Sequence, residues 1–555
     1  MRQQEQKTRQ QKRMLRGSLV TGIGTLLSRF LGMLRDAATA AMLGMSSGGV
    51  MDAFVFAFRL PEVARRMFGE GSFSTSFIPV FAKLWNEDRT RAWQLFTVAL
   101  CRIFLILTAF VLFGELACWL GLMLFEPTSK VYLAAHLMSV MLPYLILISL
   151  AAICAATLQT LGYFAIVSAI PMVLNIIWLA GILVVAPMLS DDPAGRCYLL
   201  ALCVLLAGFA QFLIQIPVLR RLGGRFDFNG KAVAPEMRTM LRNMLPTMLG
   251  LMSVQLDILA ASILAWIFSG PPGVPIRWLG RIVEYPLHAG SVAAIYYSER
   301  LFEFPQGLIG MAIATAIYPL ISRHAAKKDF QAISDDLGLA VRLQFALGIP
   351  AGIGLILFRI PLAHLLYQRG AFTPTDTFRT ADMIFWFGFA VWAICTIPVM
   401  VRGFYAVGDV RTPLRIAIGC GFLNLLLCLA LIWPLQEEGI AIGIAFSAMV
   451  QATLLINRYS KKHGLLRFRD IASRVVAALV SSLFMAVAVA LTMKAIPGND
   501  SIADILHIVG GGTVGLCVYL VLYRIFGGRE IGIFFRGKER ERFKRFSPKR
   551  RRKRK

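Results

Sequence analysis

Long apolar segments separated by short polar connections follow one another along the whole chain. A helix needs about 20 apolar residues to cross a bilayer, whereas the strands of a membrane barrel alternate over about ten. The lengths of these segments therefore predict an all-α polytopic membrane protein with about fourteen transmembrane helices. The predicted spans are 17–43, 51–81, 92–124, 131–160, 163–186, 196–219, 239–268, 290–321, 333–366, 379–405, 413–433, 439–457, 471–495 and 504–526.

Lys and Arg are distributed unevenly between the two sets of connections. If the N-terminus is cytoplasmic, the inner connections are basic, as at Arg220, Arg221 and Arg225. The outer connections are poor in Lys and Arg and include acidic pairs such as Asp191 and Asp192. Cytoplasmic loops of multi-pass proteins carry this excess of positive charge. The bias predicts that both termini face the cytoplasm and that the basic N-terminal stretch is a retained tail rather than a signal peptide.

Many charged side chains lie in or beside the first two predicted spans, where a membrane helix is normally apolar. They are Arg29, Arg35, Asp36, Asp52, Arg59, Glu62, Arg65, Arg66 and Glu70. Each ionised side chain near the bilayer centre costs about 2.5–3.5 kcal/mol, so five unpaired arginines would cost on the order of 12–18 kcal/mol. These side chains must therefore face protein or water.

Helical spacing places several of these charges on one face. Asp52, Arg59 and Arg66 are spaced by seven residues, and Glu62 and Glu70 lie four residues on either side of Arg66. This spacing predicts one charged stripe on the second span.

The first span repeats that spacing with Arg29 and Asp36, whereas Arg35 and Arg65 are predicted to point elsewhere. Two interpretations of the charges stay open. They can form internal ion pairs that lock helices together, or they can bind an anionic ligand, because arginines outnumber acids on the first span. The eighth span adds Arg300, with Glu303 about one turn further on.

Composition narrows the class of protein. The chain has 555 residues, 57% of them hydrophobic, and a formal net charge of +27, with a mean hydropathy of +0.66. Nucleic-acid binding would suit that charge, but the basic residues gather in short loops and tails, which membrane topology explains. The nine cysteines include no CxxC pair and the six histidines are scattered, so we expect no disulfide, metal site or cofactor.

Three features outside the charged stretch carry further expectations. Prolines interrupt many spans and predict kinks suited to a protein that rocks between states, although membrane helices also tolerate proline without such a role. The outer segment 271–290, with Trp278 and Tyr285 among aliphatic residues, predicts a short interfacial helix or a plain long loop. The basic tail after Arg529 is predicted to lie on anionic inner-leaflet phospholipid.

Five motifs occur in order along the chain: SRFLGMLRDAATAAMLG, DAFVFAFRLPEVARRMFGEGSFSTSFIPV, YYSERLFEFPQGLIGMAIATAIYPLISRHA, LLYQRGAFTPTDT and RGFYAVGDVRTP. Together they resemble the MurJ/MviN family of lipid II flippases, within the MOP exporter superfamily. The resemblance implies two pseudo-symmetric six-helix lobes plus two C-terminal helices. It also implies a transporter rather than an enzyme. Its substrate would be lipid II, the undecaprenyl-diphosphate-linked disaccharide-pentapeptide precursor of peptidoglycan, moved from the inner to the outer leaflet of the bacterial cytoplasmic membrane.

On this resemblance the chain divides into six parts. They are a basic cytoplasmic tail (1–16), an N-terminal lobe (17–219), a basic linker (220–238), a C-terminal lobe (239–460) with a periplasmic insertion (271–290), the last two helices (471–526) and a polybasic cytoplasmic tail (527–555).

The resemblance also implies which residues bind substrate. The family's essential arginines fall on Arg29, Arg35, Arg65 and Arg300, and its supporting acids on Asp36, Asp52, Glu70 and Glu303. Guanidinium groups are permanently charged and bind phosphate oxygens in pairs, which suits a diphosphate. The family lays the polyprenyl tail in a groove beside the last two helices. Membrane phospholipids and cell-wall synthesis proteins are further candidate partners, and we expect no nucleic acid.

Two departures from the family limit what can be transferred. Segment 271–290 is an insertion relative to the usual short loop. Some members bind sodium through acids in spans seven and eleven. At the span-seven position this chain has Ala261. In span eleven, Asn424 is followed four residues later by Cys428 rather than by an acid. Sodium coupling is therefore not implied here, although Asp257 lies one turn from Ala261.

Three rival functions remain for comparison. An exporter of drugs or of another polyprenyl-linked oligosaccharide would have the same architecture, but a drug exporter usually offers acids and aromatic rings to a cation. An enzyme acting on polyprenyl phosphates needs clustered acids for a metal or a poised base, whereas the acids here are dispersed. A purely structural scaffold does not need a charged interior. The sequence favours the flippase.

Overall fold

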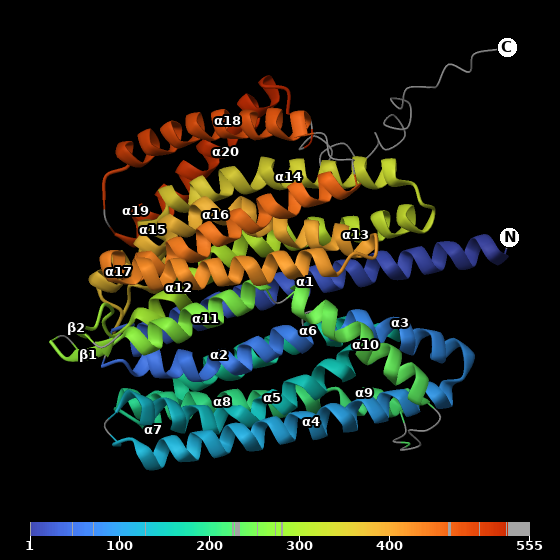
Figure 1. Ribbon diagram of the computed structural model, residues 1–555, viewed down its shortest axis with the longest axis horizontal. Coiled ribbons are helices and arrows are strands. Elements are labelled where there is room, and N and C mark those ends of the chain that lie inside the picture. Colours follow the sequence, from blue (N-terminus) through green and yellow to red (C-terminus); the bar gives the residue numbers. More distant parts are fainter. Residues whose placement is uncertain are drawn as a thin grey trace. The chain divides into compact units, whose positions relative to one another are not determined.

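The computed structural model describes residues 2–46, 48–69, 72–127, 129–224, 227, 233–251, 253–271, 273–278, 281–463, 468–498, 500–528 and 530. Helices dominate these residues (Figure 1), and the one regular sheet among them is a two-stranded hairpin. The prediction of an all-α polytopic membrane protein is confirmed.

The helices follow one another along the chain with short connections. The first twelve are α1 (Arg2–Leu43), α2 (Val50–Gly69), α3 (Ser72–Glu87), α4 (Arg89–Leu124), α5 (Lys130–Thr160), α6 (Phe164–Ala180), α7 (Ala186–Leu189), α8 (Pro193–Leu213), α9 (Ile216–Arg221), α10 (Ala234–Leu251), α11 (Ser253–Phe268) and α12 (Ser291–Pro305). The others are α13 (Met311–Ala326), α14 (Phe330–Leu357), α15 (Arg359–Tyr367), α16 (Pro374–Ala406), α17 (Arg411–His463), α18 (Phe468–Ala495), α19 (Ser501–Leu506) and α20 (Gly512–Ile525). Short π-helical segments occupy Gly181–Val185, Gln306–Gly310 and His507–Gly511.

The predicted spans fall on these helices. Ten helical stretches within the described ranges are long and apolar enough to cross a membrane by length and composition. The range 51–81 is divided between α2 and α3, and the ranges 413–433 and 439–457 share α17, whose Gln436 leaves helical geometry at φ 49°. A count of about fourteen spans is consistent with this arrangement.

The chain packs into two compact units. The first comprises Met1–Arg300, Ala363–Met383 and Ala417–Ile444, and the second comprises Leu301–Leu362, Ile384–Ile416 and Ala445–Lys555. The lobe boundaries expected near 219 and 239 stay a prediction.

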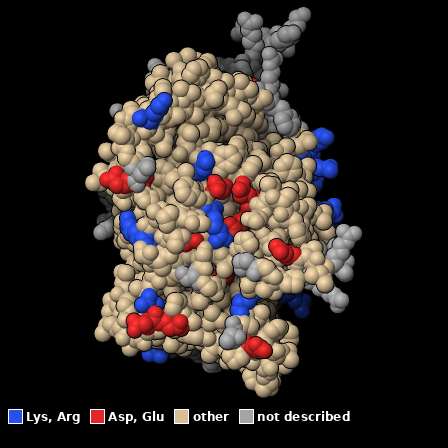
Figure 2. Space-filling model, turned by 90° about the vertical axis from the view of Figure 1, so that its left-hand side faces the viewer, with Lys and Arg blue, Asp and Glu red and all other residues tan. Residues whose placement is uncertain are grey.

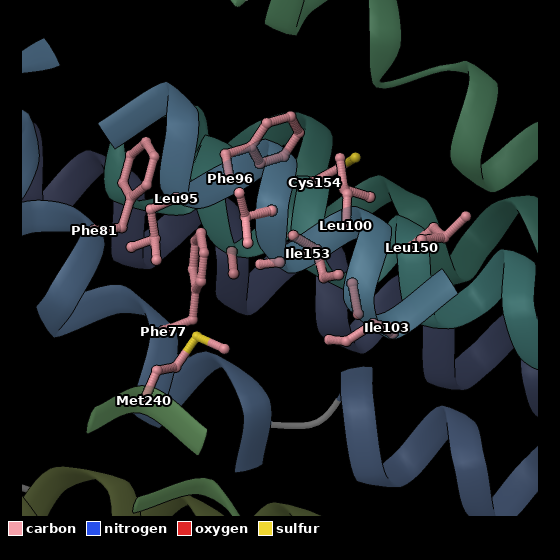
Figure 3. Packing of buried hydrophobic residues seen from close by; sticks show 14 of the residues in the cluster. Phe77, Phe81, Leu95, Phe96, Leu100, Ile103, Leu150, Ile153, Cys154 and Met240 are labelled. Atoms are coloured by element: carbon pink, nitrogen blue, oxygen red, sulfur yellow. The ribbon is translucent and has the colours of Figure 1, made fainter. Parts of the chain in front are cut away.

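A hydrophobic core in the first unit joins α3, α4 and α5 (Figure 3). Phe77 and Phe81 are fully buried, with ring centroids 5.3 Å apart. Phe96 of α4 and Ile153 of α5 belong to the same cluster (Figure 3). Truncating a buried aromatic ring to alanine costs about 3–5 kcal/mol, so this packing fixes α3 to the two longer helices.

The predicted interfacial helix or plain loop at 271–290 is wrong, because the segment forms a β-hairpin. Strand β1 (Pro275–Trp278) pairs antiparallel with β2 (Arg281–Glu284). In the sequence the strands are separated by Leu279 and Gly280, a spacing typical of a two-residue hairpin connection. Both strands mix β-branched and long side chains over only four residues each, too short a pattern to be distinguished from an amphipathic helix.

A lysine clamps the base of this hairpin. Lys130, at the start of α5, donates from Nζ to the backbone oxygens of Trp266 (2.7 Å) and Ser269. Its ammonium lies 4.9 Å from the centroid of the Trp266 ring, close enough for a cation–π interaction. The carbonyls at the C-terminal end of α11, which a helix leaves without intrahelical donors, are thereby satisfied in part.

Candidate functional site

Helix α1 contributes an adjacent basic and acidic pair. The guanidinium of Arg35 donates to Asp36 Oδ1 from Nε (2.9 Å) and Nη2 (2.6 Å). It also donates to Asn175 Oδ1 of α6 (3.2 Å) and lies 4.6 Å from the centroid of the Trp178 ring. Both members of the pair are buried. These contacts hold Arg35 against α6.

Helix α2 presents Arg59, Glu62 and Arg66 along one face, as the predicted stripe requires. Glu62 accepts hydrogen bonds from Arg59 Nη1 (3.2 Å) and Arg66 Nη2 (3.0 Å). Arg59 Nε also donates to Ser262 Oγ of α11 (3.1 Å). Glu62 is only 2% exposed, so these guanidiniums rather than water compensate its charge.

Helix α12 joins these two groups. Arg300 Nη2 donates to Glu62 Oε1 (2.5 Å), and Arg300 Nε lies 3.5 Å from Asp36 Oδ2. Tyr296 Oη donates to Asp36 Oδ1 (2.9 Å), and its ring centroid lies 4.4 Å from the Arg300 guanidinium carbon. One arginine therefore bridges the acid of α1 to the acid of α2.

Glu299 supplies a third buried acid from α12. Its Oε2 lies 2.8 Å from Arg59 Nη1, and its Oε1 lies 3.8 Å from Arg66 Nη2. The side chain is 1% exposed. We call the interconnected side chains the charged cluster; they are Arg35, Asp36, Arg59, Glu62, Arg66, Glu299 and Arg300.

Among the seven side chains that define the charged cluster, four guanidiniums share three carboxylates. A phosphate group offers the same kind of anionic oxygen acceptor as a carboxylate, in the spacing that guanidinium forks match. The cluster can therefore bind a phosphate-type anion by exchanging hydrogen bonds with its own acids for hydrogen bonds with the ligand.

The structure distributes the predicted site residues over several places. Arg35, Asp36 and Arg300 come together in the charged cluster. Arg29 lies on the same helix but is exposed, and Arg65 is partly buried.

The remaining predicted acids also differ in position. Glu303 of α12 is partly buried, and Glu70 lies outside the described residues.

Arg35 was expected to point away from Asp36, and this expectation is wrong. The long arginine side chain reaches back to the carboxylate of the next residue, although the two Cα–Cβ directions diverge around the helix.

Asp52 lies in a second polar cluster, at the N-terminus of α12. Its carboxylate accepts from the backbone N–H groups of Gly290 (2.7 Å) and Ala293 (2.8 Å). Helix starts leave such donors without intrahelical partners, and a negative charge there is also favoured by the helix dipole. Asp52 thus ties α2 to the start of α12.

Arg379 of α16 completes this second cluster. Its guanidinium donates to Ser46 Oγ (2.8 Å) and to the backbone oxygen of Ala289 (3.0 Å), and it forms an ion pair with Glu437. We call Ser46, Asp52, Arg379 and Glu437, with the 289–293 segment that they contact, the latch.

On the face of the molecule that carries β1 and β2, acidic and basic side chains are intermixed rather than separated by sign (Figure 2).

Sequence reasoning did not assign Asn175, Glu299 or the Arg379–Glu437 pair. Asn175 is an isolated amide within an apolar run, and Glu299 is an acid inside a span, so both carried a signal of buried polar contact. Arg379 and Glu437 lie at the ends of different spans, and no periodicity links them.

The residues at the positions expected for sodium do not form a two-acid site. Asn424 Nδ2 donates to the backbone oxygen of Asp257 (3.4 Å), and Cys428 Sγ contacts Asn424 Oδ1 (3.3 Å). Within the described ranges, no group of three or more His, Cys, Asp or Glu side chains is placed to hold a metal ion.

Comparisons with known proteins agree with this architecture. A family profile described as "Lipid II flippase MurJ" matches residues 39–508. A protein of Vibrio cholerae serotype O1 described as "Probable lipid II flippase MurJ" is 30% identical, with 80% of this chain and 82% of that protein covered.

Solved structures show the same fold. One described as "Lipid II flippase MurJ, inward closed conformation" superposes with a TM-score of 0.70 at 20% identity, over 92% of this chain and 98% of that chain. A multidrug resistance MATE family transporter of the MOP superfamily, in an inward-facing conformation, has a TM-score of 0.63 at 12% identity, over 80% of this chain and 98% of that chain.

Proposed function

The chain belongs to the lipid II flippase MurJ family, and on that premise we propose that it moves lipid II from the inner to the outer leaflet of the bacterial cytoplasmic membrane. It is a multi-pass membrane protein of a transporter family. Both termini are proposed to be cytoplasmic, because the basic connections then all lie inside. Phospholipids surround it, and cell-wall synthesis enzymes are proposed partners because they consume the transported precursor.

The observation that best supports this substrate is the charged cluster. A diphosphate-linked lipid carries its charge next to a long apolar tail, so its carrier needs buried cations within membrane helices. Arg35 and Arg300 converge on Asp36 from two helices, and Arg300 also reaches Glu62. We propose that the diphosphate takes the place of these carboxylates at the arginines. Arg29, Arg65, Glu70 and Glu303 are proposed to contact it at other stages of transport.

Transport is proposed to follow alternating access around a fixed site. The diphosphate headgroup is too polar to cross lipid, so the site must open first to one side and then to the other. The latch joins α2 and α16 to the start of α12 at the end that we assign to the outer side. Its hydrogen bonds must break for the outward opening and re-form afterwards.

A second candidate function is export of another polyprenyl-linked oligosaccharide or of a drug. The likeness to MATE transporters supports the fold alone. The guanidiniums of the charged cluster suit an anionic group better than a cationic drug, so anionic, diphosphate-linked substrates are the ones that this second candidate retains.

Substitution of the proposed substrate-binding arginines tests the proposed function. In cells depleted of the native protein, lipid II is expected to accumulate on the inner leaflet, and the native chain should reverse this. Arg35→Ala, Arg65→Ala and Arg300→Ala should fail to do so, whereas the Lys variants should restore part of the transport, since Lys keeps the charge but loses the paired donors. Lipid II exposed on each leaflet is the measurement. Full rescue by all three Ala variants would contradict the proposal.

Membrane topology is tested separately. A reporter fused after Lys555 should lie in the cytoplasm, and one inserted near Asp191 should lie outside, because an odd number of predicted spans separates them. The two signals are compared with a reporter fused before Met1, which should match the C-terminal one. If the Asp191 and Lys555 reporters lie on the same side, the fourteen-span topology is wrong.

A further inference from the structure

A separate polar cluster in the second unit binds a carboxylate between two arginines. Glu530 Oε1 lies 3.3 Å from Arg342 Nε of α14 and 3.1 Å from Arg474 Nε of α18. Tyr523 of α20 donates its hydroxyl to Glu530 Oε2 (3.2 Å). Glu530 is 7% exposed. Three helices thus converge on one acid that follows the last of them.

Two glycines return the chain to these helices after α20. Gly527 has φ 85°, a backbone conformation that favours glycine, and the N–H of Gly528 donates to the backbone oxygen of Tyr523 (2.8 Å). A Cβ on Gly528 would lie 2.1 Å from Tyr523 Cε1. Arg474 also donates to the backbone oxygen of Gly527. The turn is therefore built so that Glu530 reaches the arginines.

The charges in this cluster do not balance. Among the residues that the structure describes, two guanidiniums face one carboxylate, and the arginine side chains keep 23% and 26% of their surface exposed. A phosphodiester is also a monoanion with two acceptor oxygens, so it satisfies the same donors. Glu530 lies beyond the end of α20, so its carboxylate is not carried by a membrane helix.

In the proposed topology Arg474 lies near the cytoplasmic start of α18 and Glu530 follows the cytoplasmic end of α20, whereas Arg342 lies about midway along α14. Lysines and arginines dominate the sequence beyond Glu530, and such segments are attracted to the anionic lipids of the inner leaflet. When the tail binds to that surface, phospholipid headgroups come close to Arg342 and Arg474. There a headgroup can take the place of Glu530.

We propose that Arg342 and Arg474 form a binding site for the phosphate of an anionic phospholipid of the inner leaflet, and that Glu530 is the internal ligand that competes for it. Occupation of the site by lipid separates the carboxylate of Glu530 from the two arginines. Occupation by Glu530 holds α14, α18 and α20 together. The site is independent of the charged cluster and of the flippase reaction, but it rests on the proposed cytoplasmic position of the C-terminus.

Retention of phosphatidylglycerol by the purified full-length protein tests this site. Glu530→Gln removes the competing charge, so the affinity for phosphatidylglycerol should rise by about threefold or more. Adding Arg342→Gln and Arg474→Gln to that variant should abolish the gain. Lys494→Gln, at the other end of α18, removes one charge from the same helix and should leave retention unchanged. Every variant keeps the polybasic tail, so the contribution of the tail cancels. Lipid bound per protein is measured by mass spectrometry.

Three outcomes would overturn the proposal. The first is equal retention by the native chain, Glu530→Gln and the variant lacking both arginines. The second is equal retention of phosphatidylcholine, because a zwitterionic headgroup should not gain from the excess positive charge. The third is displacement of phosphatidylglycerol by inorganic phosphate at equal concentration, which would assign the pair to a free anion. Thermal unfolding of each variant shows whether the protein is folded, and the lipid II assay reports transport independently.

Discussion

Replacing Glu62 with glutamine is expected to abolish lipid II transport and to destabilise the folded protein by about 3–5 kcal/mol, the usual cost of breaking a buried ion pair from one side. The carboxylate contacts Arg59, Arg66 and Arg300, and it is 2% exposed. A neutral amide would leave three guanidiniums with less compensation in a site that water barely reaches. Complementation of a depleted strain measures transport, and thermal unfolding of the purified protein measures stability.

Two further substitutions make the result specific. Glu62→Asp keeps the charge and should retain part of both properties. Glu87→Gln makes the same chemical change at an exposed ion pair with Lys83, whose side chains are 55% and 74% exposed, and should change stability by less than about 0.5 kcal/mol. If Glu62→Gln supports growth and unfolds like the native chain, the charged cluster does not have the role proposed for it.

A covalent crosslink across the latch is expected to stop transport completely. Met51 precedes Asp52, whose carboxylate is bonded to the N–H of Ala293. Cysteines at Met51 and Ala293, joined by a short thiol-reactive crosslinker, should prevent α2 from separating from the start of α12. Transport should fall to background and return when a cleavable crosslinker is reduced. The nine native cysteines are first replaced.

A second crosslink controls for modification itself. Cysteines at Lys83 and Glu87 lie one turn apart on α3, so joining them constrains no movement between helices, and transport should continue. Normal transport by the fully crosslinked Met51–Ala293 protein would exclude alternating access through the latch. A fixed groove along which the headgroup slides would then be the better mechanism.

Helical periodicity predicted contacts within a helix better than contacts between helices. The spacing of Arg59, Glu62 and Arg66 placed them on one face, and they do pair there. The same reasoning could not identify Asn175 or Glu299 as partners, because periodicity gives the face of a helix but not the helix that packs against it.

The errors have physical causes that can be named. A four-residue strand carries too few positions to reveal its alternation, so β1 and β2 were mistaken for an interfacial helix or loop. The position of Arg35 was misjudged because the direction of Cβ was taken for the direction of a long, flexible side chain. The bond from Asp52 to Gly290 joins a carboxylate to the backbone, and backbone donors have no sequence signature.

The sharing of carboxylates among the arginines bears on how quickly a carrier can turn over. Four unpaired guanidiniums would hold a diphosphate so tightly that release would limit the cycle, since each additional 1.4 kcal/mol of affinity is about a tenfold longer residence at an unchanged association rate. If the charged cluster binds the diphosphate as proposed, Asp36, Glu62 and Glu299 would pair with the arginines again as the ligand departs. On that proposal the acids would compete with the ligand for the arginines and keep its affinity low enough for release.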